Sequence, residues 1–179
     1  MGRDRGGWLV TALFAFGAAA LVLALVPAAW PNPLPQGDVA PADALPKLRE
    51  AATAVDAACS RGDLAAFANA TTAQHRADLQ QRLAALQLPL DSATLRELAI
   101  DAALTPWLDQ PLLAGEVRGD RVVVAFARPG GDGAQCLAFV WSGRGWRFDG
   151  ARHAVGVGTA ADAATWLRAS WPERNPRRP

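Results

Sequence analysis

The sequence feature that most constrains this chain is an uncharged stretch near its start. Between Arg5 and Asp38 there is no ionisable side chain. Within this stretch, residues 8–26 read WLVTALFAFGAAALVLALV. A helix of that length rises about 28 Å, which is close to the roughly 30 Å hydrocarbon core of a bilayer. We therefore expect one transmembrane helix, over residues 8–30, followed by a separate domain.

The charges that flank the stretch predict its orientation. Arg3 and Arg5 precede it, whereas the first basic residue after it is Lys47. Basic residues close to a span stay on the cytoplasmic side, so residues 1–7 should be cytoplasmic and the C-terminal domain should lie outside the cytoplasmic membrane. The alternative is a cleaved signal peptide, whose apolar region is usually shorter, about 7–15 residues. Both interpretations export the domain.

Length and composition bound the exported part. The chain has 179 residues and a formal net charge of +1, which leaves one small domain and no strong positive field for nucleic acid. Lysine occurs only at Lys47 and arginine is frequent, which suggests a GC-rich bacterial genome. We expect residues 31–43 to be a proline-rich linker, residues 44–171 to be the domain, and residues 172–179 to be a disordered tail.

Apolar residues recur at helical spacing in the first part of the domain. The first such series comprises Leu45, Leu48, Ala52, Val55 and Cys59. Gly62 can end this helix and Asp63 can cap a short second one. A capping box at Thr71 begins a third helix, and Asp91 or Ser92 begins a fourth.

From about residue 112 the apolar period changes to two, which is typical of strands. Strand-like runs lie near Val117 and at residues 121–128, 134–142 and 146–149, and short glycine-containing turns separate them. Such turns predict an antiparallel meander. Residues 159–170 predict a last helix. The fold class is therefore α+β, with helices packed on one face of a curved antiparallel sheet and one transmembrane helix in front.

This order resembles the nuclear-transport-factor-two-like, or SnoaL-like, superfamily. The resemblance covers about residues 44–150. Its motifs are the helix over residues 51–63 that closes on Ser-Arg-Gly-Asp, the run VRGDRVV at 117–123, and GWRFD at 145–149. It implies a cone-shaped domain with a pocket. Some bacterial relatives, including Mce-associated membrane proteins, place such a domain behind one membrane helix, and the layout here is similar.

Two histidines and one aspartate are the candidates for acid–base chemistry. His75 lies in line with Leu79 on its expected helix, where it could point into a pocket or sit at the rim of the core. His153 follows the sheet near Asp149, and a His–Asp pair suits proton transfer. Nothing in the pattern shows that these two side chains face each other. The histidines have no Cys–His spacing, so we expect no metal site.

Tryptophans and cysteines give two further expectations. Trp107, Trp141 and Trp146 could line an apolar ligand cavity, or they could fill the core, which we favour. Cys59 and Cys136 are the two cysteines of an exported domain and could form a disulfide. The bridge requires that the first helix cover the side of the strand on which Cys136 lies.

These observations predict a membrane-anchored, extracytoplasmic, non-catalytic domain. It would bind an envelope protein partner or an apolar small molecule, and its N-terminal helix would bind the lipid bilayer. One alternative is a SnoaL-like enzyme that uses a His/Asp pair, and another is a structural spacer in an envelope complex. We expect no cofactor and no nucleic-acid partner.

Overall fold

The structure, a computed structural model, describes residues 41–130 and 133–170. The elements in this part, in chain order, are α2 (Pro41–Arg61), α3 (Leu64–Ala70), α4 (Ala73–Ala85), α5 (Ser92–Asp101), the 3-10 helix η1 (Thr105–Asp109), β1 (Leu112–Arg118), β2 (Arg121–Ala127), β3 (Gly133–Trp141), β4 (Trp146–Val155) and α6 (Ala160–Ser170).

Several of the predicted segments lie wholly or partly outside the described residues. The predicted linker extended to residue 43, whereas α2 already begins at Pro41. The predicted membrane helix at residues 8–30, the segment 1–7 and the tail 172–179 lie outside the described residues. Among the helices of the described part, none is long and apolar enough to cross a bilayer.

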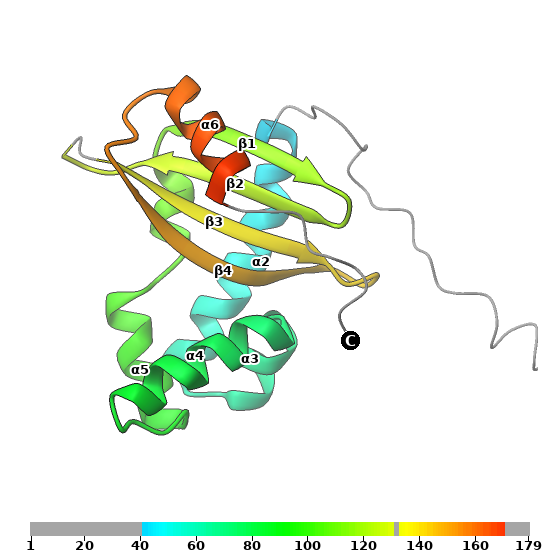
Figure 1. Cartoon of the computed structure of the whole chain (residues 1–179). Helices are drawn as coiled ribbons and strands as arrows, with labels where there is room; N and C mark the ends of the chain where they lie inside the picture. Colours follow the sequence, from blue (N-terminus) through cyan, green and yellow to red (C-terminus); the bar gives the residue numbers. More distant parts are fainter. Residues whose placement is uncertain (1–40, 131–132, 171–179) are drawn as a thin grey trace, which may run out of the picture. The chain divides into compact units, whose positions relative to one another are not determined.

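The four strands form the predicted antiparallel meander. Their order in the sheet is β1-β2-β3-β4, so each strand pairs with its neighbours in sequence and the sheet is open, with β1 and β4 at its edges. Figure 1 shows α2 on one face of this sheet, α6 on the other, and α3, α4 and α5 gathered beyond the β4 edge. The α+β class predicted from the sequence is confirmed.

The expectation that helices cover one face of the sheet is wrong, because α6 covers the second face. The strands have bulky residues toward α2 and small ones toward α6. Toward α2 lie Val122, Val124, Phe126, Leu137 and Phe139. Toward α6 lie Val123, Ala125, Ala134, Cys136 and Ala138, packed against Ala163 and Leu167. Both central strands are therefore buried on both faces, which matches the unbroken apolar run in β2.

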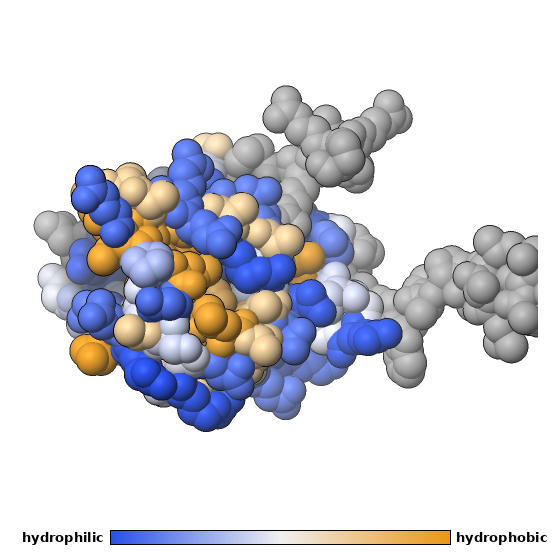
Figure 2. All heavy atoms as spheres, turned by 90° about the horizontal axis from the view of Figure 1, so that it is seen from below, coloured by the Kyte–Doolittle hydropathy of each residue, from blue (hydrophilic) through white to orange (hydrophobic). Residues whose placement is uncertain are grey.

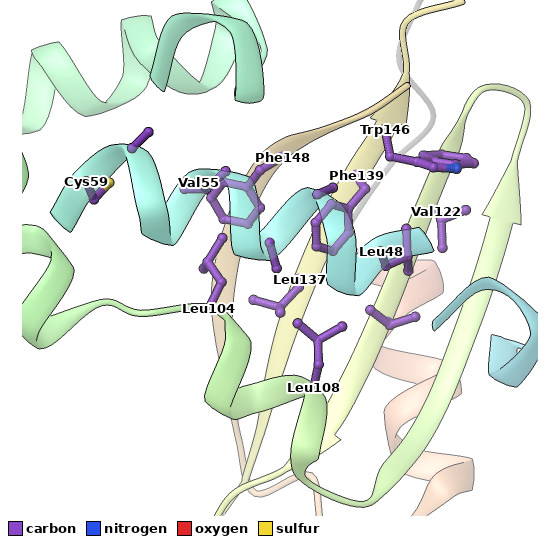
Figure 3. Packing of buried hydrophobic residues seen from close by; sticks show 14 of the residues in the cluster. Leu48, Val55, Cys59, Leu104, Leu108, Val122, Leu137, Phe139, Trp146 and Phe148 are labelled. Carbon is purple, nitrogen blue, oxygen red and sulfur yellow. The ribbon is translucent and has the colours of Figure 1, made fainter. Parts of the chain in front are cut away.

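The larger core lies between α2 and the sheet, as Figure 3 shows. Leu48 and Val55 project from α2 onto Phe139 and Phe148, and Leu108 of η1 closes one side. The phenyl rings of Phe139 and Phe148 meet edge to face at 5.7 Å between centroids. Such pairs add to the stabilisation that burial of apolar area provides.

The two cysteines do not form the disulfide that the sequence allowed. Both thiols are free and buried. Cys59 belongs to the cluster between α2 and the sheet, whereas Cys136 belongs to the cluster under α6. The backbone of the sheet separates them, because Cys136 has the strand phase opposite to Leu137.

Helix starts in the described part follow the sequence signals closely. The Asp63 side chain accepts from Ala66 N at 2.9 Å and caps α3, and Asp91 caps α5. Gly62 ends α2 with φ of +66°, and a Cβ there would lie 2.6 Å from the Ser92 carbonyl oxygen. The cap of α4 is Thr72, one residue after the predicted Thr71.

Asp56 ties the segment after α5 to the middle of α2. Its Oδ1 accepts from Leu104 N at 2.8 Å, and its Oδ2 accepts from Thr105 N at 2.8 Å and from the Thr105 hydroxyl at 2.6 Å. These three bonds hold the start of η1 against α2. They also set where the chain enters β1.

Replacing Asp56 with alanine should lower the free energy of unfolding by about 1.5–3 kcal/mol, because hydrogen bonds to a charged group are lost and two backbone N–H groups lose their acceptor. Urea unfolding of the full-length chain measures the change. Glu50→Ala is the matched control: Glu50 is an exposed acid on the same helix, and its loss should change stability by less than about 0.5 kcal/mol. Equal effects of the two substitutions would contradict this role for Asp56.

Candidate ligand-binding site

The segment between α3 and α4 is hydrogen-bonded to the edge strand β4. Thr71 forms a parallel bridge with Phe148, and the backbone N–H of Thr72 donates to the Phe148 carbonyl at 2.9 Å. The Thr72 hydroxyl oxygen accepts from the backbone N–H of His75 at 3.2 Å and so caps α4. These contacts fix the first turn of α4, and His75 with it, beside β4.

Asp149 lies in a β-bulge of β4. Phe139 pairs with Phe148 and Ala138 pairs with Gly150, so Asp149 is the extra residue between the two pairs. Gly150 has φ of +150°, a conformation that favours glycine. The bulge also changes the phase of the strand, so that Phe148 and Ala151 both face α2.

The Asp149 carboxylate is buried and engaged at both oxygens. Only 1 % of the side chain is exposed. Oδ1 accepts from the Thr72 hydroxyl at 2.6 Å, and Oδ2 is paired with the Arg121 guanidinium from β2. A carboxylate taken out of water requires partners of this kind. Asp149 therefore holds the start of α4 to the sheet.

A polar cleft of about 340 Å³ lies between α4 and the bulge. The helix contributes His75, Asp78, Leu79 and Arg82 to its wall. Their spacing of three and four residues places all four on one face of α4. The sheet contributes Arg121, Asp149 and Arg152. The cleft therefore combines three arginines with two aspartates and one histidine.

An apolar cavity of about 240 Å³ adjoins this cleft, between α2, α4, α5 and β4. Most of its wall is apolar. The apolar lining includes Val55, Cys59, Phe67, Leu98, Leu104 and Phe148. Its polar lining residues are Asp56 of α2 and His75 and Arg82 of α4. A mostly apolar space with a few polar groups is the usual form of a small-molecule site.

Four residues line both spaces and form the boundary between them. Three belong to α4 and one to β4: His75, Leu79, Arg82 and Ala151. Figure 2 shows this end of the domain from below, with apolar surface set among charged and polar side chains. A molecule in the apolar cavity would therefore present one end to the polar cleft.

The His75 ring is packed against aromatic residues at this boundary. Its centroid lies 4.8 Å from that of Phe148, edge to face, and 6.3 Å from that of Phe67. Burial lowers the pKa of His75 below its usual 6.5, and the nearby Asp149 carboxylate opposes that shift. The imidazole is therefore neutral at neutral pH and can both donate and accept one hydrogen bond.

Acidification should destabilise the domain through His75. Because its pKa is lower in the folded state, the unfolded chain binds the proton more tightly, so the stabilisation is complete above about pH 6.5 and falls as the pH falls toward the folded-state pKa. Urea unfolding between about pH 7.5 and 5 measures the slope. His75→Gln should reduce this slope of stability against pH. An unchanged slope in His75→Gln would contradict this origin.

The structure brings two of the three acid–base candidates together. His75 and Asp149 line the same polar cleft. His153 does not line it: its ring is exposed, and its Nε2 lies 3.0 Å from Nη1 of Arg128. The pair suggested by closeness in sequence, His153 with Asp149, is therefore replaced by His75 with Asp149.

The three tryptophans proposed for a cavity pack with the core between α2 and the sheet. Trp146 is buried, and Trp107 and Trp141 are half-buried against the same cluster. The rings of Trp141 and Trp146 lie 5.5 Å apart. None of the three lines the polar cleft or the apolar cavity. Their place in the core agrees with the interpretation that we favoured.

Sequence reasoning missed several residues of the site, among them Thr72, Arg82 and Arg121. Thr72 carried a signal, because threonine is a common N-cap residue. The capping-box pattern nevertheless placed the cap at Thr71. Arg121 and Arg82 carried none, because an arginine at a strand start or on a polar helix face is ordinary. Only the register of β2 against β3, together with that of β3 against β4, brings Arg121 to Asp149.

The two cysteine thiols, of which only Cys59 lines the apolar cavity, are protonated at neutral pH. Burial, with a smaller contribution from Asp56, raises the pKa of Cys59 to about 11. Burial alone raises the pKa of Cys136 to about 12. A protonated thiol is a poor nucleophile and a poor metal ligand. The described residues contain no group of three or more His, Cys, Asp or Glu that could hold a metal ion.

Comparison with known proteins leaves the family open. No protein-family model matches the chain, and no curated protein or solved structure is significantly similar to it.

Proposed function

We propose that the domain binds a small apolar molecule in the cavity between α2, α4, α5 and β4. The observation that carries this proposal is the apolar lining of that cavity beside a polar cleft. The lining residues come from α2, α3, α4, α5, β4 and the segment after α5, and the packing of these parts leaves the space unfilled. An apolar cavity of this kind takes up apolar ligands in preference to water.

The hydrogen bonding of His75 and Asp149, the two acid–base candidates in the cleft, supports binding better than catalysis. Both oxygens of Asp149 are engaged, by Thr72 and by Arg121. Within the described part of the chain, the His75 ring makes no hydrogen bond to another side chain. An enzyme that uses His75 with Asp149 stays the second candidate, because both line the same cleft and their charges interact.

Photolabelling of the full-length chain tests the proposal. The probe is a decanol derivative with a diazirine on its chain, and the protein is kept in lipid nanodiscs because of the predicted span. We expect the label on peptides of α5 and α4. Ala99→Phe places a ring at the cavity wall. This variant should require at least tenfold more probe for the same extent of labelling, equivalent to a loss of about 1.4 kcal/mol in binding free energy.

Ile100→Phe is the matched control for this experiment. Ile100 is the next residue of the same helix, and 83 % of its surface is exposed. This variant should be labelled like the unmodified chain. Equal labelling of the Ala99→Phe and Ile100→Phe variants, or no label in α4 and α5, would reject the cavity as a binding site and favour an envelope protein partner or a spacer role.

The location that we propose for the domain rests on the sequence. Residues 8–30 would anchor it in the cytoplasmic membrane, with the domain outside. The resemblance of residues 44–150 to the nuclear-transport-factor-two-like superfamily implies a pocket between helices and sheet, and membership of that superfamily is likewise a proposal that rests on the sequence.

The chain should fractionate with membranes and resist alkaline carbonate extraction, because a bilayer-spanning apolar helix is not released by a change of charge. Protease added outside spheroplasts should remove the domain. A soluble form that begins near Ala29 would instead identify a cleaved signal peptide, and complete protection from protease would overturn the orientation.

A further inference from the structure

We propose that the ligand of the apolar cavity is an amphiphile with an anionic oxygen head, and that Arg82 binds this head while the chain occupies the cavity. This inference rests on the proposed function. It adds the class of ligand and the residue that selects it.

Arg82 is placed to contact both parts of such a molecule. It lies on the same face of α4 as His75 and Leu79, and it lines both the apolar cavity and the polar cleft. The guanidinium forms no hydrogen bond or ion pair with any other described residue. Its donors are therefore available to a ligand at the boundary of the two spaces.

The other charged groups of the cleft have partners within the protein. Arg121 is paired with Asp149, and Arg152 donates to the Ser170 carbonyl. On α4, Asp78 accepts from the Gln74 side-chain amide at 2.8 Å. A ligand head that enters the cleft thus meets Arg82 as a cation without a competing hydrogen bond.

The balance of charge in the cleft also favours an anion. Three arginines and two aspartates line it, and His75 is neutral, so one positive charge is in excess. A planar guanidinium binds carboxylate or phosphate oxygens through two parallel hydrogen bonds. The head could belong to a free fatty acid or to a phosphate monoester, since both present such oxygens.

Competition for the same photolabel distinguishes these ligands. The full-length chain in nanodiscs is labelled with the decanol probe while decanoate, decyl phosphate, decanol or decyltrimethylammonium competes. Decanoate or decyl phosphate should compete at concentrations at least tenfold lower than decanol, and the stronger of the two identifies the head. The cationic competitor should be the weakest.

Variants at Arg82 show whether this residue is responsible. In Arg82→Gln, the anionic competitor should be needed at the same concentration as decanol to reduce labelling. Competition by decanol itself should be unchanged in this variant, which would show that the cavity is intact. Arg82→Lys should retain part of the preference. Arg144→Gln, an exposed arginine in the β3–β4 turn, should behave like the unmodified chain.

The outcomes separate the two proposals. No labelling of α4 and α5 by the decanol probe would reject the binding function. Labelling without a preference for the anions, or an equal preference in Arg82→Gln, would overturn the assignment of the head and leave the apolar site standing.

Discussion

Replacing Arg121 with methionine is expected to lower the free energy of unfolding by about 3–5 kcal/mol, because the substitution removes the guanidinium charge that is paired with the buried Asp149 carboxylate. The two side chains are 14 % and 1 % exposed. The Thr72 hydroxyl would be left as a neutral donor to Asp149, and it cannot replace the guanidinium charge. Urea unfolding of the full-length chain measures the loss.

Two further variants separate the charge from the volume of the side chain. Arg144→Met removes an exposed arginine of the neighbouring turn and should cost less than about 0.5 kcal/mol. Combining Arg121→Met with Asp149→Leu should recover part of the stability, because no unpaired charge remains. A double variant that is less stable than Arg121→Met alone would show that the carboxylate is needed for another reason.

Replacing Trp146 with alanine is expected to cost about 3–5 kcal/mol, the usual range for a buried aromatic side chain. Trp146 is 8 % exposed and belongs to the core between α2 and the sheet. In the described part of the chain, its indole N–H has no hydrogen-bond acceptor. Trp146→Phe should therefore cost much less, about 1–2 kcal/mol, because most of the ring remains and no hydrogen bond is broken.

The difference in stability between Trp146→Ala and Trp146→Phe tests the packing argument more sharply than either loss alone. Ile100→Ala provides the surface reference and should change stability by less than about 0.5 kcal/mol, since 83 % of Ile100 is exposed. Equal losses in Trp146→Ala and Trp146→Phe would mean that the indole N–H has an acceptor, and the packing argument would fail.

Local signals were sufficient to predict most elements of the described domain. The change from helical to alternating period places the starts of β2, β3 and β4 to within one residue, and glycine turns predict the antiparallel order of the strands. The predicted end of the last strand at residue 149 is wrong, because β4 continues to Val155 and contains His153. Asp63 and Asp91 cap the helices that the sequence assigned to them. These features depend on neighbours a few residues away, so they can be recognised without knowing the fold.

The covering of the second sheet face was missed although the sequence carried a signal. Residues 122–126 are continuously apolar, and a strand exposed on one face would alternate instead. The covered second face also explains why the cysteines form no disulfide. Once α6 covers the second face, Cys136 is buried there with alanines, and a bond to Cys59 is excluded.

The site could not be predicted because it depends on register. A single extra residue at Asp149 sets the phase of the rest of β4, and no composition rule places a bulge there. The approach of α4 likewise depends on the bridge between Thr71 and Phe148, which no local pattern announces. Helical spacing did place His75 and Leu79 on one face of their helix. This is the part of the site that could be predicted from the sequence.

The Thr72–Asp149 contact also has a consequence for motion. It closes a loop of 77 residues, so the site is complete only after the β3–β4 hairpin has formed and α4 has docked on it. Few bonds join α4 to the sheet, whereas the strands are paired along their whole length. Hydrogen exchange should therefore show α4 opening while the sheet stays protected, which gives a bound molecule a route in and out without global unfolding.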